Sequence, residues 1–484
     1  MQEGPARPSA RARRGWIAAG VTVVMLLGVG GIGAALTAGR GGSSTAHATG
    51  SVPLHPVTAT ILPSTTTSTS TTSTTSTTTT RPTAPPTTIS PAARLAPRLT
   101  TVMSGYTGCL VVEDGGTVVY SDDAGVPFAP ASTEKLLTAT AALLKLGPGF
   151  RFETDVVAAA PPSAGTVSDL WLVGAGDPML ATPAYAARLA QDPETAGFPV
   201  TPLSTFASAL AAAGVKTVTN GIHGDDSRYD RVRYVPSWPA FYATEEDIGP
   251  LSALGLNEGL ASWSPTPVAP GDPPAFAAAQ LAGLLTQQNI HAAGAADSTA
   301  PTPRVVLARV YSAPLATIIS QMLRVSDNYT AEMLTKELGR QIAGVGSTAA
   351  GTSVTTQTVA RLGLPTSGLH MVDGSGLDRG DRSTCRLELA TLDLAARNSA
   401  LSPIGAGLAV AGETGTLIAR YNHTPFQGRV EAKTGSLDGV MAMVGHEEVG
   451  RALRFAFIVN GIFTWPQGTA IEDRLLFALA TYPN

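Results

Sequence analysis

The sequence lacks the features of several large classes of protein. It contains only two cysteines, Cys109 and Cys385, and they do not have the spacing of a metal site. In an oxidising compartment the two could pair, but two buried free thiols fit the sequence as well. The net charge is only −4 and no basic stripe with interleaved aromatic residues occurs, so we expect no nucleic-acid partner.

Two common kinds of hydrolase site are also missing. The chain has no Gly-x-Ser-x-Gly elbow, because its nearest candidate, Asp373-Gly-Ser-Gly376, has the wrong spacing. His446-Glu447 begins like the helix of a zinc protease, but Gly450 stands where the second histidine would be. The sequence therefore implies no metal and no other cofactor.

The N-terminal part of the chain has the pattern of an exported protein. Residues 1–14 contain four arginines and precede an uncharged stretch of 25 residues, 15–39. This stretch exceeds the roughly 20 residues that a helix needs to cross a bilayer, and the arginines place residues 1–14 in the cytoplasm. We expect an uncleaved transmembrane anchor. The alternative is a signal peptide cleaved after Ala46-His-Ala48, and either reading exports the remainder.

A Ser/Thr/Pro-rich linker follows over residues 40–91. Every residue from Ser64 to Thr80 is Ser or Thr. Such a segment has no apolar side chains to offset the entropy of ordering, which predicts a disordered tether. A tether of this kind suits a catalyst that must reach a target beyond the membrane surface, and an inert spacer, glycosylated or not, is the plainer alternative.

The remaining residues predict an α+β fold. Strand patterns occur at both ends, in a hairpin over 108–120 and in successive runs between 430 and 459. Helical patterns lie between them, including an apolar run over 136–144, and a last helix is expected over 471–481. This order predicts one antiparallel sheet that is closed by the two ends of the folded chain.

The middle of this region has a different character. Residues 156–303 show short strands, many Gly and Pro turns and an Ala-rich helix near 205–213. We expect a mostly β accessory domain here, inserted into a catalytic domain made of residues 92–155 and 304–484.

Three short motifs occur in an order that is more informative than any one of them. A Ser-x-x-Lys or a Ser-x-Asn is expected roughly once or twice by chance in a chain of this length, whereas Lys-Thr-Gly is rarer. Each motif can supply part of one acyl-transfer site that uses no histidine. The motifs are Ser132-Thr-Glu-Lys135, Ser326-Asp-Asn328 and Lys433-Thr-Gly435.

The first motif contains a nucleophile and a base. Lys135 stands three positions after Ser132, so the two side chains share one face of a helix. A lysine can accept the serine proton only when it is neutral, and burial or a neighbouring cation can lower its pKa far enough. Lys433 is the obvious second cation. Ser326 can relay a proton to the leaving group, and Asn328 can hydrogen-bond both Lys135 and the substrate amide.

The third motif suits substrate binding. A strand that contains Lys433 can hold the substrate along its edge, where the Lys433 charge and the Thr434 hydroxyl suit a terminal carboxylate. Gly435 permits a close approach. The backbone N–H groups of Ser132 and Ser436 would then form the oxyanion hole. Taken alone, each serine could be a helix N-cap and the lysine a solvated strand residue.

With these motifs in this order, the chain resembles the penicillin-binding, serine D-Ala-D-Ala peptidase superfamily. More narrowly it is similar to its class C low-molecular-weight group, the D-alanyl-D-alanine carboxypeptidase/endopeptidases. That group carries an insertion between the first two motifs, which here lie 194 residues apart, from Ser132 to Ser326. Further segments resemble motifs of the group: 172–180, 225–229, 250–254 with Asn257, and the Asp-Gly-Ser-Gly-Leu signature at 373–377.

The resemblance implies a penicillin-binding/β-lactamase-like transpeptidase fold and a serine D,D-peptidase. Ser132 would be acylated by a peptidoglycan stem peptide, the terminal D-alanine would leave, and water would release the product. The same enzymes also cut D,D-cross-links in some cases and take β-lactams as covalent inhibitors. For Asp373 and Ser375 a structural turn is expected rather than a part in the chemistry.

One departure and two rival functions remain at this point. The group often carries a third small β domain, whereas only a short Pro-rich connection follows Trp263 here. A β-lactamase would share the three motifs, but the long insertion argues against it. A wall-binding scaffold without activity is disfavoured because all the catalytic side chains are present.

Overall fold

The main sheet joins the two ends of the described chain. The computed structural model describes residues 89–484. Strand β1 (Thr107–Asp114) pairs antiparallel with β14 (Leu453–Asn460), which comes from the C-terminal region. The other strands are β2 (Thr117–Asp122), β11 (Ala409–Val410), β12 (Val430–Leu437) and β13 (Val440–Glu447). The order β11-β12-β13-β14-β1-β2 is antiparallel throughout, which confirms the predicted α+β fold.

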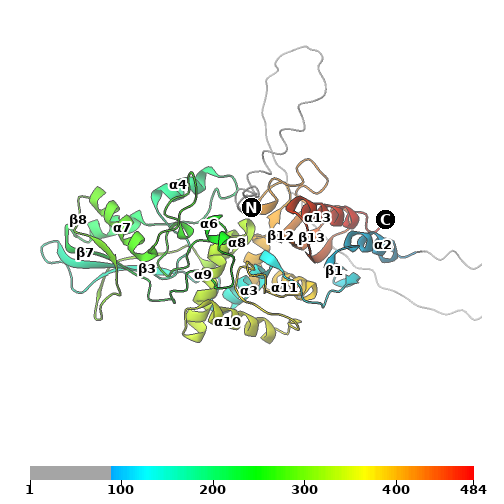
Figure 1. Ribbon diagram of the computed structural model, residues 1–484, viewed down its shortest axis with the longest axis horizontal. Helices are drawn as coiled ribbons and strands as arrows, with labels where there is room; N and C mark the ends of the chain where they lie inside the picture. The colour runs from blue at the N-terminus through cyan, green and yellow to red at the C-terminus, as the bar shows by residue number, and fades with distance from the viewer. Residues whose placement is uncertain (1–88) are drawn as a thin grey trace, which may run out of the picture. The chain divides into compact units, whose positions relative to one another are not determined.

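Each face of this sheet has its own apolar core. Successive side chains of a strand point to opposite faces, so Leu110 belongs to one core and Val111 to the other. Helices α2 (Pro91–Met103) and α13 (Trp465–Leu479) cover the first face and lie side by side, blue and red in Figure 1. The second face is covered by α3 (Lys135–Leu146), α8 (Leu315–Val325) and α11 (Cys385–Arg397).

The apolar run predicted over 136–144 lies within α3, and the expected last helix is present at the C-terminal end. There the last helix begins at Trp465 rather than near residue 471, because the Gln467 side chain accepts a hydrogen bond from the Thr464 backbone N–H at 2.8 Å. The remaining helices of this layer are α9 (Asn328–Leu338), α10 (Thr348–Arg361) and the short α12 (Ser402–Ala406).

A second sheet, which we call the accessory sheet, occupies the predicted insertion. It contains β10 (Val305–Tyr311), β3 (Glu153–Ala158), β4 (Thr166–Val173) and β7 (Thr217–Asp225), in that order. The sheet is mixed, because β4 and β7 are parallel whereas β3 pairs antiparallel with both of its neighbours. It extends a few residues beyond 156 and 303, since β3 and β10 pair along their whole length.

Helices pack on the accessory sheet and fill its core. Phe206 and Leu210 of α5 (Ser204–Ala212) and Leu281 of α7 (Pro273–Gln287) belong to the same apolar cluster as the strands. Residues 260–272, between Gly259 and α7, contain an isolated bridge and no strand, so the small third β domain is absent from the described chain. The shorter elements are α4 (Pro183–Gln191), α6 (Phe241–Thr244), β5 (Leu180–Ala181), β6 (Thr201–Pro202), β8 (His291–Ala292) and β9 (Ala295–Asp297).

The predicted N-terminal segments lie outside the described residues. This applies to the cytoplasmic segment 1–14, to the anchor at 15–39 and to nearly all of the linker, 40–91. Among the helices formed by residues 89–484, none is long and apolar enough to cross a membrane.

A disulfide connects the main sheet to the helical layer. Cys109 on β1 and Cys385, the first residue of α11, are bonded to each other and buried. The sequence allowed either a disulfide or two free thiols, and the structure contains the disulfide. The bond joins positions 276 residues apart and therefore links both halves of the catalytic fold.

We predict that this bond contributes strongly to stability. The double variant Cys109→Ala/Cys385→Ala should lose about 2–5 kcal/mol of unfolding free energy, because the cross-link restricts the unfolded chain. Denaturant titration measures this loss. Alkylation of the denatured wild type should modify no thiol before reduction and both cysteines after it, and modification without reductant would contradict the pairing.

Candidate active site

The predicted nucleophile lies in a tight turn that precedes a helix. Ser132 belongs to a 3-10 turn, Ala131–Glu134, which leads directly into α3. The sequence predicted a helix here, with Ser132 and Lys135 on one face. In a 3-10 turn the side chains at positions i and i+3 are in line. Accordingly, the Lys135 Nζ lies 2.8 Å from the Ser132 Oγ.

Lys135 is buried and surrounded by three oxygen atoms. Besides Ser132, its Nζ contacts the Asn328 Oδ1 at 2.7 Å and the Ser375 carbonyl oxygen at 2.6 Å. These two carbonyl oxygens can only accept hydrogen bonds, whereas the serine hydroxyl can also donate. A neutral Lys135 can therefore donate both of its hydrogens to the carbonyls and point its lone pair at the Ser132 hydroxyl.

Asn328 is oriented by a contact on its other side. It is the first residue of α9, and its Nδ2 donates to the Asp247 carbonyl oxygen at 2.9 Å. Since a carbonyl cannot donate, this contact requires the amide nitrogen to face Asp247 and the amide oxygen to face Lys135.

Ser326 and Lys433 form a second pair. Ser326 ends α8 in the left-handed conformation, with φ 59° and ψ 42°, which is uncommon for a residue other than glycine. It does not cap the next helix, because the Asp327 side chain accepts the Thr330 N–H there. The Lys433 Nζ donates to the Ser326 Oγ at 2.8 Å, and Lys433 is buried rather than solvated.

The predicted substrate strand runs directly past the nucleophile. A Cβ added to Gly435 would lie 2.8 Å from the Pro130 carbonyl oxygen and 3.1 Å from the Ser132 nitrogen, so only glycine fits. The Thr434 Oγ1 lies 2.7 Å from the Thr416 Oγ1, and Ser436 is exposed.

These groups surround one cavity of about 340 Å³. Lys135 and Lys433 lie buried beneath it, each in contact with a serine that lines the cavity. The structure thus brings together every predicted site residue. The predicted residues that line the cavity are Ser132, Ser326, Asn328, Thr434, Gly435 and Ser436.

Three contributors to this site were missed by sequence reasoning. The carbonyl groups of Ser375 and Asp247 act through the backbone, for which no side-chain pattern exists. Thr416 adds a second hydroxyl beside Thr434. It belongs to a short 3-10 turn, Gly415–Leu417, and its signal would have been the Thr-Gly-Thr sequence ahead of the substrate strand.

Comparison with known proteins identifies the family. Residues 92–303 and 297–481 match the D-Ala-D-Ala carboxypeptidase 3 (S13) family. The chain belongs to this family. It is 31% identical over 455 residues to a D-alanyl-D-alanine carboxypeptidase from an Actinomadura species, with 78% of this chain and 81% of that protein covered. It is also 32% identical over 391 residues to a carboxypeptidase from Mycobacterium tuberculosis, with 79% of each covered.

Solved structures show the same fold. Penicillin-binding protein 4 (dacB) from Haemophilus influenzae superimposes with a TM-score of 0.68 at 20% identity, covering 81% of this chain and 99% of that one. A structure of the same protein complexed with a β-lactam gives a TM-score of 0.63. The resemblance to class C low-molecular-weight penicillin-binding proteins is confirmed.

In this S13 peptidase the Asp-Gly-Ser-Gly-Leu signature forms a turn that contacts Lys135. The Asp373 Oδ1 accepts the N–H groups of Ser375 and Gly376, at 2.9 and 2.7 Å. The buried Glu332 Oε1 accepts from Gly374 and Ser375, at 2.9 and 2.8 Å. The turn that the sequence predicted for Asp373 and Ser375 is therefore present, and it also aims the Ser375 carbonyl at Lys135.

Several carboxyl groups lie buried around the two lysines. Burial, followed by the charge of Asp373, raises the pKa of Glu332 to about 8 and that of Asp381 to about 10. Burial also raises the pKa of Glu388 to about 7, although the Lys433 charge opposes the shift. At neutral pH a protonated Glu332 places no full negative charge near Lys135, so it does not stabilise the ammonium form.

The shift at Glu388 predicts a pH-dependent stability. The folded protein holds this proton to about pH 7, whereas a free glutamate releases it near 4.5. The contribution of Glu388 to the unfolding free energy is therefore complete below about pH 4.5 and is lost as the pH rises through 7. The unfolding free energy of wild type relative to Glu388→Gln should fall by about 3 kcal/mol at most over this interval.

Denaturant titrations of both proteins between pH 4.5 and 8 provide the measurement. The difference between them isolates Glu388 from the other buried carboxyl groups. A difference that rises with pH, or that stays constant, would contradict the shift.

Proposed function

We propose that this protein is a serine D,D-peptidase that removes the terminal D-alanine from peptidoglycan stem peptides through an acyl-enzyme on Ser132. The observation that carries the proposal is the set of contacts at Lys135. Its Nζ contacts the Ser132 hydroxyl and also two carbonyl oxygens that can accept its hydrogens. Membership of a D-Ala-D-Ala carboxypeptidase family supports the same reaction.

Acylation follows from this geometry. The Ser132 hydroxyl gives its proton to the neutral Lys135 while its Oγ attacks the carbonyl carbon of the penultimate D-alanine. The backbone N–H groups of Ser132 and Ser436 stabilise the resulting oxyanion. The C–N bond then breaks, and the proton that Lys135 took from Ser132 passes to the leaving amine through the Ser326 hydroxyl, which lines the cavity beside Lys433, so that Lys135 is neutral again. In the second half, water attacks the ester carbonyl while Lys135 accepts a proton from the water. Lys135 then returns this proton to the Ser132 Oγ as the ester bond breaks, which releases the shortened peptide and restores the free enzyme.

Recognition of the substrate end is assigned to the Lys433 side of the cavity. The terminal carboxylate would bind near the hydroxyls of Thr434 and Thr416, which lie together at the cavity wall. The buried Lys433 contributes positive charge beneath them. A β-lactam presents an amide and a carboxylate in the same relation, so it should acylate Ser132 as well. The β-lactam complex of the Haemophilus influenzae protein supports this extension.

Cleavage of D,D-cross-links would use the same steps. In a cross-link the scissile D-alanyl carbonyl is bonded to the side-chain amine of another stem peptide rather than to D-alanine. Ser436, which lines the cavity on the substrate strand, is exposed to solvent. We therefore include endopeptidase action as a second reaction of the same site.

We also propose that the site acts outside the cytoplasm on a membrane-tethered protein. The support is the arginine-rich segment 1–14 followed by 25 uncharged residues and the long Ser/Thr/Pro-rich linker. This arrangement would place the catalytic part in the compartment that contains peptidoglycan.

A pentapeptide ending in D-Ala-D-Ala tests the proposal. Wild type should release D-alanine, and Ser132→Ala should be slower by at least about 10³-fold, because the nucleophile is gone. Ser353→Ala, which changes an exposed serine of α10, is the matched control and should keep wild-type activity. Equal release by wild type and Ser132→Ala would refute the mechanism.

A fluorescent penicillin separates the peptidase from a β-lactamase. The peptidase should retain a covalent adduct through denaturing electrophoresis, and Ser132→Ala should retain none. Rapid loss of the label with accumulation of hydrolysed penicillin would instead identify a β-lactamase.

A further inference from the structure

One segment that leaves the accessory sheet contacts α9 and the chain near Asp247, which both position Asn328. Residues 225–233 begin at the end of β7 and include the Asp-Asp-Ser-Arg-Tyr motif, to which the chemistry assigns no role. The motif starts from a fixed position, because the Asp225 carboxylate accepts the N–H groups of Ser227 and Ala300, at 2.9 and 2.8 Å.

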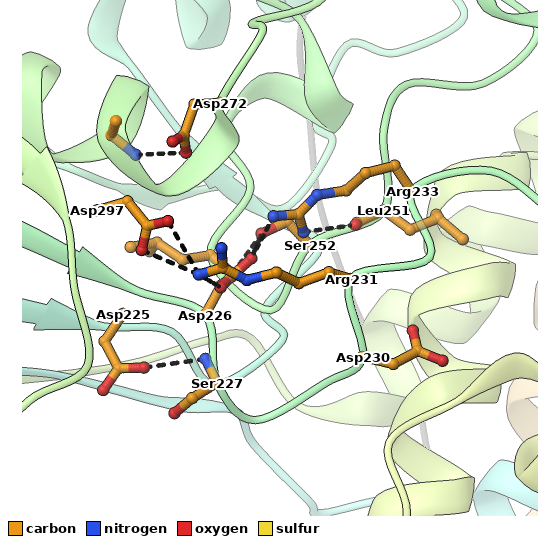
Figure 2. A network of polar contacts seen from close by, with 12 residues as sticks. Asp225, Asp226, Ser227, Asp230, Arg231, Arg233, Leu251, Ser252, Asp272 and Asp297 are labelled. Atoms are coloured by element: carbon orange, nitrogen blue, oxygen red, sulfur yellow. Dashed lines mark hydrogen bonds and ion pairs between the residues drawn. The ribbon is translucent and has the colours of Figure 1, made fainter.

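Asp226 is the centre of a buried polar network in this segment (Figure 2). Its carboxylate contacts the Arg233 Nη2 at 2.6 Å and the Arg231 Nη2 at 3.2 Å, and accepts the Ser252 hydroxyl at 3.0 Å. The two arginines differ in their other partners. Arg231 is mostly exposed and extends to Asp297, whereas Arg233 extends to Leu251.

Arg233 connects the network to the 250–254 motif. Its Nη1 donates to the Leu251 carbonyl at 3.0 Å, and the Leu251 N–H donates back to the Arg233 carbonyl at 2.8 Å. Together with the bond from Ser252 to Asp226, these contacts hold residues 251 and 252 by three hydrogen bonds.

The backbone carbonyl that orients Asn328 belongs to Asp247, four residues before Leu251. The Asp247 carbonyl accepts the Asn328 Nδ2, and the Asn328 Oδ1 faces Lys135. Tyr242 and Ile248, on either side of Asp247, pack in one apolar cluster with Leu251 and with Tyr329, the residue after Asn328. A displacement of the chain near Leu251 would therefore move the Asp247 carbonyl.

The same segment also holds the other end of α9. Arg228 donates to Glu337 through two nitrogens, at 2.9 and 2.7 Å, and the Tyr229 hydroxyl donates to the same buried carboxylate at 2.8 Å. Asp230 pairs with Lys336. These contacts from residues 228–230 hold the C-terminal end of α9, whereas the Asp247 carbonyl contacts the amide of Asn328 at its N-terminal end.

We propose that the Asp226–Arg233 ion pair is a positioning device for acylation, acting through the Asp247 carbonyl on the amide of Asn328. The inference rests on the function proposed above. It assigns a role to two motifs of the insertion, 225–229 and 250–254. Arg233 touches neither Ser132 nor the cavity wall, so it is a positioning residue and not a catalytic one.

The two arginines on Asp226 provide a matched pair for the test. Arg233→Ala removes the contact to Leu251, while Arg231 still pairs with Asp226. Arg231→Ala removes a charge from the same carboxylate but leaves the contact to Leu251. Acylation by fluorescent penicillin should be about 10- to 100-fold slower in Arg233→Ala, because small displacements of a catalytic group are costly. In Arg231→Ala it should stay within about twofold of wild type.

A double-variant comparison tests the route. If Arg233 acts through Asn328, Arg233→Ala/Asn328→Ala should be acylated as slowly as Asn328→Ala alone, since coupled residues are not additive. A further tenfold loss in the double variant would contradict this route. Arg233→Lys keeps a charge for Asp226 but cannot span both partners, so it should be slower than wild type and faster than Arg233→Ala.

The outcomes separate this inference from the proposed function. No acylation of wild type, or equal acylation of Ser132→Ala, would overturn the function itself. Normal wild-type acylation with Arg233→Ala as fast as Arg231→Ala would overturn the positioning role alone. Thermal unfolding of each variant accompanies the kinetics. If Arg233→Ala does not fold, Arg233→Lys decides, and a wild-type rate in that variant would refute the inference.

Discussion

The rest of this structure depends on the hydrogen-bond contacts of the buried Lys135 amine. Lys135 can act as a base when oxygens that never donate accept its hydrogens, so that its lone pair is left for Ser132. Those two oxygens come from Asn328 and Ser375, which are distant from Lys135 in the sequence. The fold must therefore bring three separate parts of the chain to one nitrogen atom within hydrogen-bonding distance.

Each part is held by its own supports. The main sheet places β12 against the turn that contains Ser132, and Gly435 allows the two backbones to meet. Asp373 and Glu332 fix the turn that presents the Ser375 carbonyl. The segment 225–233, which begins at the end of β7, holds α9 and the chain around Asp247. The Asp247 carbonyl in turn orients Asn328. The insertion contains none of the proposed catalytic side chains, but it helps to position one of them, Asn328.

The sequence was sufficient for the side chains of the site and insufficient for its backbone groups. Ser132, Asn328 and Lys433 were predicted because their chemistry requires particular residue types in order. The carbonyls of Ser375 and Asp247 could not be predicted, because every residue has one and only the fold selects which is used. The same limit applies to the pairing of Cys109 with Cys385, which depends on a distance between β1 and α11, and to the left-handed turn at Ser326.

The central claim, that Lys135 accepts the proton of Ser132, is tested most directly by the acylation rate of Lys135→Arg. Arginine keeps the positive charge and the hydrogen-bond donors but cannot be deprotonated in a protein. Fluorescent penicillin should therefore acylate this variant about 10²- to 10⁴-fold more slowly than wild type, at equal thermal stability. A rate within about tenfold of wild type would show that a cation is enough and would contradict the account.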